Sequence, residues 1–198
     1  MLMKQISESV KLPVSEEIAF NVLLDIDVLL RLSPYWSLKE LKPLSVGTVR
    51  EGSRYEATIE YYAKEVTETR GIEFLEVSKD KRVSFRVENG ILKEIDFTIE
   101  RDGDGVQLTK MFLLECEDET VLNGARNEVH YWLRSIGEYL KLAGGRTLWK
   151  RFLKWFMDRA WLRLTLSERK IAIIVTKISI VELALLLLLI FIWNLFIN

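Results

Sequence analysis

Alternating apolar and polar positions dominate the middle of the chain. In residues 54–61, one set of alternate positions is apolar or aromatic and the other is charged or carries a hydroxyl group, as in an antiparallel strand with one buried face. Similar segments follow at residues 65–77, 82–88, 91–101 and 106–117. Because no helical period appears between residues 36 and 117, we expect these strands to form one meandering sheet.

Helical spacing of apolar residues appears on both sides of this region. Ser15 is a natural helix N-cap before two acidic residues, and the apolar spacing after it predicts two short helices between residues 13 and 33. Residues 119–143 carry a continuous apolar stripe that predicts one long helix. A weakly alternating strand at residues 3–12 precedes them all, so the element order predicts an α+β domain over residues 1–144.

This element order resembles that of the START-related helix-grip superfamily (SRPBCC), which includes birch pollen allergens, polyketide cyclases and coenzyme Q-binding proteins. The local marker is PVSEEIAFNVLLDIDVLLRLSPYWSLKEL, in which proline and small polar residues lead into a helix, an Asp-containing break and a turn with Pro and Trp. The resemblance covers about residues 3–143. It implies a helix-grip fold, with a curved antiparallel sheet of about seven strands around the long helix and an apolar cavity between them for a hydrophobic ligand.

Aromatic and polar side chains occupy the strand and helix faces that should meet around such a cavity. The expected ligand-binding residues are Tyr55, Tyr61, Phe85, Phe97, Lys110, Phe112 and Trp132. Plain core packing would place the same residue types at these positions, so both interpretations stay open. Lys110 is the most specific candidate, since it alternates with Leu108 and Phe112 and a buried lysine needs a partner. It would otherwise reach water at the edge of the sheet.

The sequence contains no recognisable constellation for catalysis or metal binding. His130 is the only histidine and lies between two arginines, off the apolar stripe, which indicates a solvated side chain. Cys116 is the only cysteine, so an intramolecular disulfide and a cysteine-rich zinc site are excluded. The DGDG turn at residues 102–105 lacks the later ligands of a calcium loop. We therefore expect no catalytic residues, metal or cofactor, and the sequence favours a binding protein over an enzyme.

The last stretch of the chain, residues 178–197, is apolar almost throughout. Only Ser179, Glu182 and Asn194 interrupt it, and about 20 apolar residues are enough for a helix to cross a membrane. A buried core helix or an oligomer-forming coil is the alternative, but a chain of this length cannot enclose a helix that is apolar all round. We expect a single-pass transmembrane helix in a tail-anchored protein.

A basic, aromatic segment at residues 145–177 precedes the apolar run. Its pattern is typical of an amphipathic helix that lies at a membrane surface, with rings at the acyl boundary and cations on anionic headgroups. The expected interface residues are Trp149, Lys150, Arg151, Lys154, Trp155, Arg159 and Trp161. Packing of this helix on the domain is an alternative. Nucleic-acid binding is disfavoured, because residues 1–144 carry 26 acidic against 19 basic side chains.

These observations predict a membrane-anchored protein that binds or transfers a hydrophobic small molecule such as a lipid, isoprenoid or quinone. Membrane lipids are its expected partners, and the sequence identifies no protein partner. Basic residues precede the apolar run and none follows it, which places the domain in the cytoplasm. Two alternatives remain. One is a cyclase- or aromatase-type enzyme acting on a membrane-derived substrate, and the other is a membrane scaffold whose cavity is filled by its own side chains.

Overall fold

The computed structural model describes residues 3–61, 66–88, 90–145 and 147–197 of the chain. It divides into two compact units, Met1–Arg163 and Leu164–Asn198, and each is considered by itself. The first unit contains the sheet and the cavity described below. The second is a single helix.

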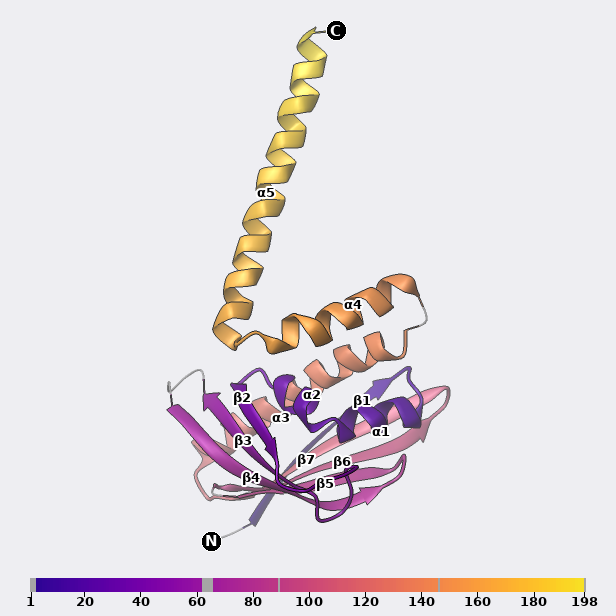
Figure 1. Ribbon diagram of the computed structural model, residues 1–198, viewed down its shortest axis with the longest axis vertical. Helices are drawn as coiled ribbons and strands as arrows, with labels where there is room; N and C mark the ends of the chain where they lie inside the picture. Colours follow the sequence, from indigo (N-terminus) through magenta and orange to yellow (C-terminus); the bar gives the residue numbers. More distant parts are fainter. Residues whose placement is uncertain (1–2, 62–65, 89, 146, 198) are drawn as a thin grey trace. The chain divides into compact units, whose positions relative to one another are not determined.

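Seven antiparallel strands form one sheet in the first unit, in the order β1-β7-β6-β5-β4-β3-β2. They are β1 (Met3–Leu12), β2 (Trp36–Pro43), β3 (Arg54–Tyr61), β4 (Val66–Ser78), β5 (Arg82–Val87), β6 (Leu92–Asp102) and β7 (Gly105–Glu115). The predicted meander is confirmed from β2 to β7, and β1 joins it along β7. Register shifts in β2, β4 and β6 bend these strands, and Figure 1 shows the sheet curving beneath its helices.

The predicted strand alternation is clearest in β7. Every second residue is buried along its whole length, namely Val106, Leu108, Lys110, Phe112 and Leu114. The residues between them are half-buried, because they lie on the opposite face of the sheet. No register shift interrupts the pairing of β7 with β1, so the buried set keeps to one face throughout.

Three helices pack on the sheet with capped N-termini. Ser15 accepts a hydrogen bond from the backbone N–H of Ile18 at the start of α1 (Glu16–Leu24), and Asp25 caps α2 (Ile26–Arg31). The long helix α3 (Glu119–Ala143) lies on the concave side of the sheet (Figure 1). Its apolar stripe is buried, as predicted. The expected α+β class, with a seven-stranded curved antiparallel sheet around a long helix, is confirmed.

The segment after α3 folds back on the domain. It forms α4 (Leu148–Arg159), which packs against α3, and a short 3₁₀ helix, η1 (Trp161–Arg163), whose Leu162 is buried. On the inner face of α4, Lys154 donates to Asp158 at 2.6 Å and to the hydroxyl of Tyr139 at 3.1 Å. The basic segment expected at residues 145–177 is thus divided among α4, η1 and the start of the following helix.

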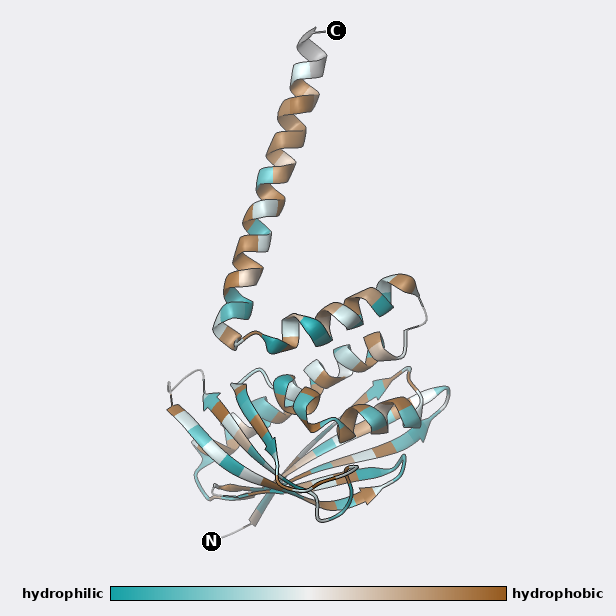
Figure 2. Cartoon of the chain, in the orientation of Figure 1, coloured by the Kyte–Doolittle hydropathy of each residue, from teal (hydrophilic) through white to brown (hydrophobic). Residues whose placement is uncertain are grey.

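The second unit is the helix α5 (Leu166–Ile197), which begins 12 residues before the expected apolar span. Thr165 and Glu168 explain this start, because each accepts a hydrogen bond from the other's backbone N–H in a capping box. Within it, Leu166–Trp193 is long and apolar enough to cross a membrane, and an 18-residue stretch of it has a mean hydropathy of 2.6. In Figure 2, most of the length of this helix has the colour of hydrophobic residues.

Candidate ligand-binding cavity

An apolar cavity of about 590 Å³ lies between the sheet and α3, as expected for a ligand-holding domain. This volume is within the range of small-molecule sites. The sheet side is formed mainly by aliphatic and aromatic residues of β3 to β7, among them Ala57, Ile59, Ile72, Phe85, Val87, Ile95, Phe112 and Leu114. The N-terminal half of α3 forms the opposite side, and residues near the β5–β6 turn complete the wall.

Small residues on the facing elements make this space. Ala57 lines it from β3, while Gly124 and Ala125 line it from α3. A Cβ atom added at Gly124 would meet no atom within 4 Å. Two turns further along α3, Trp132 is fully buried and does not line the cavity.

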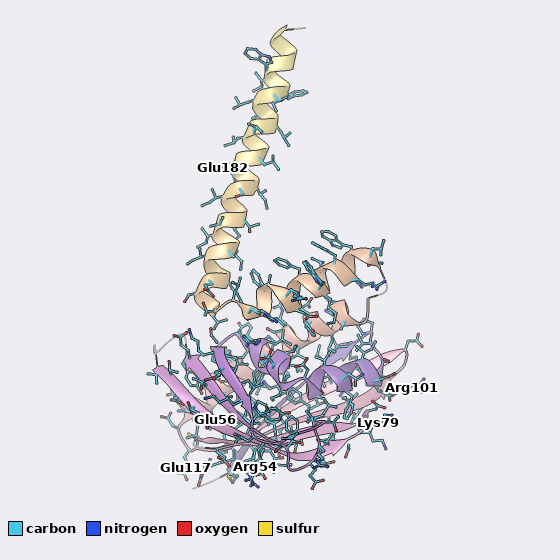
Figure 3. The ribbon with its side chains drawn as sticks, in the orientation of Figure 1. Arg54, Glu56, Lys79, Arg101, Glu117 and Glu182 are labelled. Carbon is cyan, nitrogen blue, oxygen red and sulfur yellow. The ribbon has the colours of Figure 1, made fainter. Side chains whose placement is uncertain are left out.

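Three of the seven expected ligand-binding residues line the cavity, namely Tyr61, Phe85 and Phe112. Of the other four, Tyr55 packs edge-on against Phe74, with ring centroids 6.0 Å apart. Arg54 also lies away from the cavity, since it pairs with Glu73 and Figure 3 shows it on the side of the sheet opposite α3.

Phe97 and Trp132 do not line the cavity, so the expectation that both form its wall is wrong. Trp132 donates its indole N–H to the carbonyl of Leu29 at 3.0 Å and packs against Trp36 and Phe112. Phe97 is fully buried beside Phe85. These rings form the packed core behind the cavity. A sequence pattern cannot distinguish an aromatic residue of the packed core from one that lines a cavity.

Lys110 points inward, as the β7 alternation predicts, and is completely buried. Its ammonium nitrogen lies 3.3 Å from the ring centroid of Trp132 and 4.4 Å from that of Phe112. Within the described part of the chain it has no hydrogen-bond partner. Burial lowers the pKa of Lys110 well below its usual value, and the Coulombic attraction of Glu128 opposes this. Lys110 lies behind the cavity wall.

Glu128, which the sequence interpretation missed, lines the cavity directly. Desolvation raises the pKa of its carboxyl group to about 7, while Lys110 and Arg70 act in the opposite direction. One carboxyl oxygen, Oε1, is buried without a hydrogen-bond partner among the described residues. Glu128 follows Ala125 by three residues and precedes Trp132 by four. This helical spacing was the available signal, because it puts the carboxyl group on the inward face of α3.

Other polar groups of the cavity wall come from β2 and β4. Arg70 donates to Glu68 through Nε at 3.0 Å and also through Nη2, so the two charges pair with each other. Trp36 presents an indole N–H that is buried and without an acceptor in the described structure. Among the described residues, the mostly apolar wall therefore carries the carboxyl group of Glu128, the free indole N–H of Trp36, the Arg70–Glu68 ion pair and the hydroxyl groups of Tyr35 and Tyr61.

The remaining sequence candidates for chemistry lie outside the cavity. His130 is half exposed on α3, and its Nδ1 lies 2.6 Å from a carboxyl oxygen of Glu8 on β1. The DGDG sequence forms the hairpin turn between β6 and β7, with Gly103 at φ 59°. Among the described residues, no group of three or more His, Cys, Asp and Glu side chains gathers in a metal-binding arrangement.

No family model matches this sequence, and no curated protein matches it. Solved structures do match. The crystal structure of Ara h 8.0201 is 12% identical with a TM-score of 0.55, and the match covers 70% of this chain and 98% of that chain. Protein CV1439 from Chromobacterium violaceum is 16% identical with a TM-score of 0.56, and the match covers 70% of this chain and 98% of that chain. The Aha1 dimer from Colwellia psychrerythraea is 14% identical with a TM-score of 0.53, and the match covers 72% of this chain and 99% of that chain.

The domain has the helix-grip fold. At these identities the likeness establishes the fold alone, so any role of the cavity has to be argued from its own residues. The helix-grip elements β1 to α3 account for the cavity. The segment after α3, with α4 and η1, adds a further surface to the domain.

That surface is the outer side of α4, and it is unusually apolar. We refer to its exposed residues Leu148, Trp149, Phe152, Trp155 and Phe156 as the aromatic face of α4. Figure 3 shows ring-bearing side chains along the side of α4 that points away from α3. Phe152 stacks with Trp149 and with Trp155, at centroid distances of 5.7 and 5.9 Å. The helix thus turns its aromatic side outward and holds the domain through its polar side.

The expected membrane-interface residues divide between the two sides of α4 and η1. Trp149, Lys150, Arg151, Trp155 and Arg159 are exposed. Lys154 instead joins Tyr139 and Asp158 on the inner side, and Trp161 packs partly buried against the core. Five of the seven expected residues are therefore available to an outside surface.

Proposed function

We propose that this protein is a membrane-anchored helix-grip protein that binds a hydrophobic molecule in its cavity and exchanges it with the bilayer. The observation that carries the proposal is the apolar space of about 590 Å³ between the sheet and α3, in a chain that also has a span-length apolar helix. An apolar molecule gains free energy by leaving water for such a space. Suitable ligands include lipids, isoprenoids and quinone-like molecules.

The aromatic face of α4 supports the exchange step. Exposed tryptophan and phenylalanine rings bind favourably at the boundary between headgroups and acyl chains. Lys150, Arg151 and Arg159 are exposed beside these rings and complement anionic headgroups. Because α4 is fastened to α3 by polar contacts, contact of this face with a bilayer would hold the whole helix-grip domain against the membrane. The Lys and Arg residues that precede α5 favour the cytoplasmic side.

Transfer of a fluorescent lipid from proteoliposomes holding the full chain to acceptor vesicles tests the proposal. The wild-type chain should accelerate transfer several-fold over protein-free vesicles. Ala125→Leu places a larger side chain in the cavity and should abolish the acceleration. Asn127→Leu, on the exposed side of α3, is the matched control and should transfer as wild type. Equal rates for Ala125→Leu and wild type would overturn the proposal.

A second candidate function is catalysis on a membrane-derived substrate, and Glu128 is the observation that favours it. A cavity carboxyl group with a pKa of about 7 suits a general acid or base at neutral pH. The other titratable groups on the described cavity wall are Glu68 and Arg70, which pair with each other, and two tyrosines. Glu128 would therefore act without a second free carboxyl group on this wall. A scaffold with a filled cavity is disfavoured by the open space.

A further inference from the structure

Three residues near Trp132 each have a buried polar atom without a hydrogen-bond partner. The atoms are Trp36 Nε1, Glu128 Oε1 and Lys110 Nζ, and all are unpaired within the described part of the chain. Trp36 packs edge-on against Trp132 with centroids 5.0 Å apart, and Lys110 stands over the same ring. Glu128 precedes Trp132 by about one helical turn. We call Trp36, Lys110 and Glu128 the polar end of the cavity.

Two of these groups reach the cavity itself. Trp36 and Glu128 line it, whereas Lys110 lies behind Trp132 and Phe112. A buried donor or acceptor that loses its water without gaining a partner is costly. A ligand whose polar group faces Trp36 and Glu128 removes that cost. The remaining wall is mostly apolar and suits a hydrocarbon chain or ring system.

The charged residues of the cavity wall determine which polar head group of a ligand fits. Its one described cation, Arg70, is held by Glu68, and burial favours the neutral form of Lys110. The described wall therefore has no unpaired cation for a carboxylate or phosphate, and an ionised Glu128 would repel either. An ammonium group suits Glu128, but it has no lone pair to accept the N–H of Trp36.

We propose that the cavity takes a neutral, hydroxyl-bearing amphiphile, with its hydroxyl group at the polar end and its hydrocarbon part along the sheet. The hydroxyl oxygen accepts the indole N–H of Trp36, and the hydroxyl hydrogen is donated to the carboxyl group of Glu128. A hydroxyl is both donor and acceptor, so it pairs with Glu128 in either protonation state. This inference rests on the proposed function and adds the chemistry of the ligand's head.

Matched photoactivatable probes test the inference on the full chain in phosphatidylcholine nanodiscs. The probes share one diazirine-bearing C16 tail and end in a hydroxyl, a carboxylate or an ammonium group. Crosslinks to cavity-lining peptides are quantified relative to the probe incorporated in each nanodisc. The hydroxyl probe should label these peptides at least about fivefold more than either charged probe, the effect of roughly one hydrogen bond.

Two variants test whether the hydroxyl group of the ligand contacts Trp36 and Glu128. Trp36→Phe keeps the ring but removes the donor, and it should lower labelling by the hydroxyl probe about fivefold. Glu128→Gln removes the negative charge and should raise labelling by the carboxylate probe. Glu138→Gln, on the exposed side of α3, is the control and should change neither.

The outcomes separate this inference from the proposed function. Equal or stronger cavity labelling by a charged probe would overturn the neutral head and leave ligand binding standing. Unchanged labelling in both Trp36→Phe and Glu128→Gln would overturn the polar end as the head site. Absence of cavity labelling by all three probes would overturn the proposed function itself.

Discussion

At the scale of single residues, the lysine and the glutamate near Trp132 illustrate what a sequence reveals. Lys110 could be placed inside because strand alternation is strict and β7 has no irregularity in its pairing with β1. Its surroundings could not, since ring contacts from α3 depend on how the helix packs on the sheet. Glu128 was missed because helical spacing alone does not separate a carboxyl group at the edge of an apolar stripe from one in solvent.

Glu128 should make stability depend on pH. Its pKa is about 7 in the folded chain and near 4.5 when unfolded, so the folded state binds the extra proton between these values. This stabilisation is complete below pH 4.5 and is lost as the pH rises through 7. Relative to Glu128→Gln, the wild-type chain should lose about 2–3 kcal/mol of unfolding free energy between pH 4.5 and 7.5. Denaturant unfolding in detergent measures this, with Glu138→Gln as control. Parallel pH profiles for wild type and Glu128→Gln would contradict the assignment.

The buried side chain of Lys110 should lower the free energy of unfolding of the wild-type chain. Replacing it with methionine removes a buried, unpaired amino group and keeps a flexible apolar side chain of similar length. Lys110→Met should therefore raise the unfolding free energy at pH 7 by about 1–3 kcal/mol. Lys141→Met, at an exposed site paired with Glu138, should stay within about 0.5 kcal/mol of wild type. A clear destabilisation by Lys110→Met would show that the amino group has a stabilising partner.

At the scale of elements, periodicity and capping residues were enough to predict the helices and strands from β1 to α3. They were not enough to predict the arrangement of the helices that follow α3. The strand 54–61 and the helix 119–143 were predicted with the bounds they have. The segment 145–177 was expected as one amphipathic helix, but it is divided at η1 and by the capping box at Thr165. Its aromatic residues were identified, whereas the direction they face depends on the Tyr139–Lys154–Asp158 contacts with α3, which a helical period cannot show.

The aromatic face of α4 should contact lipid. In nanodiscs made with dibrominated phosphatidylcholine, the fluorescence contributed by Trp155 should be strongly quenched. This contribution is the difference in emission between the wild-type chain and Trp155→Phe. The contribution of Trp132, measured with Trp132→Phe, is the internal control, since Trp132 is fully buried, does not line the cavity and should be quenched little. Equal quenching of the two contributions would place the aromatic face of α4 away from the bilayer.

At the scale of the whole molecule, a cavity-bearing domain and a span-length helix occur in one chain. Periodicity and resemblance together were enough to predict the fold and the presence of a cavity. They were not enough to give its wall, because the wall is set by small residues such as Ala57 and Gly124 that leave space. The packed rings behind the wall, such as Phe97, look the same in sequence as rings that line a cavity.

The anchor makes a prediction of its own. The full chain should remain with membranes through an alkaline carbonate wash, because about 20 apolar residues of α5 are enough to cross the hydrocarbon core. A chain that ends at Arg163 should be released by the same wash. Release of the full chain by carbonate would mean that α5 does not span the membrane.

The central claim is that the cavity holds a hydrophobic molecule, and mass spectrometry of bound ligands tests it most directly. The full chain, purified in mild detergent, should carry close to one hydrophobic molecule per chain above the background of lipid that copurifies with the Ala125→Leu variant. Wild type and the Asn127→Leu control should retain this molecule, and Ala125→Leu should lose it. Identical bound lipids in wild type and Ala125→Leu would contradict the account.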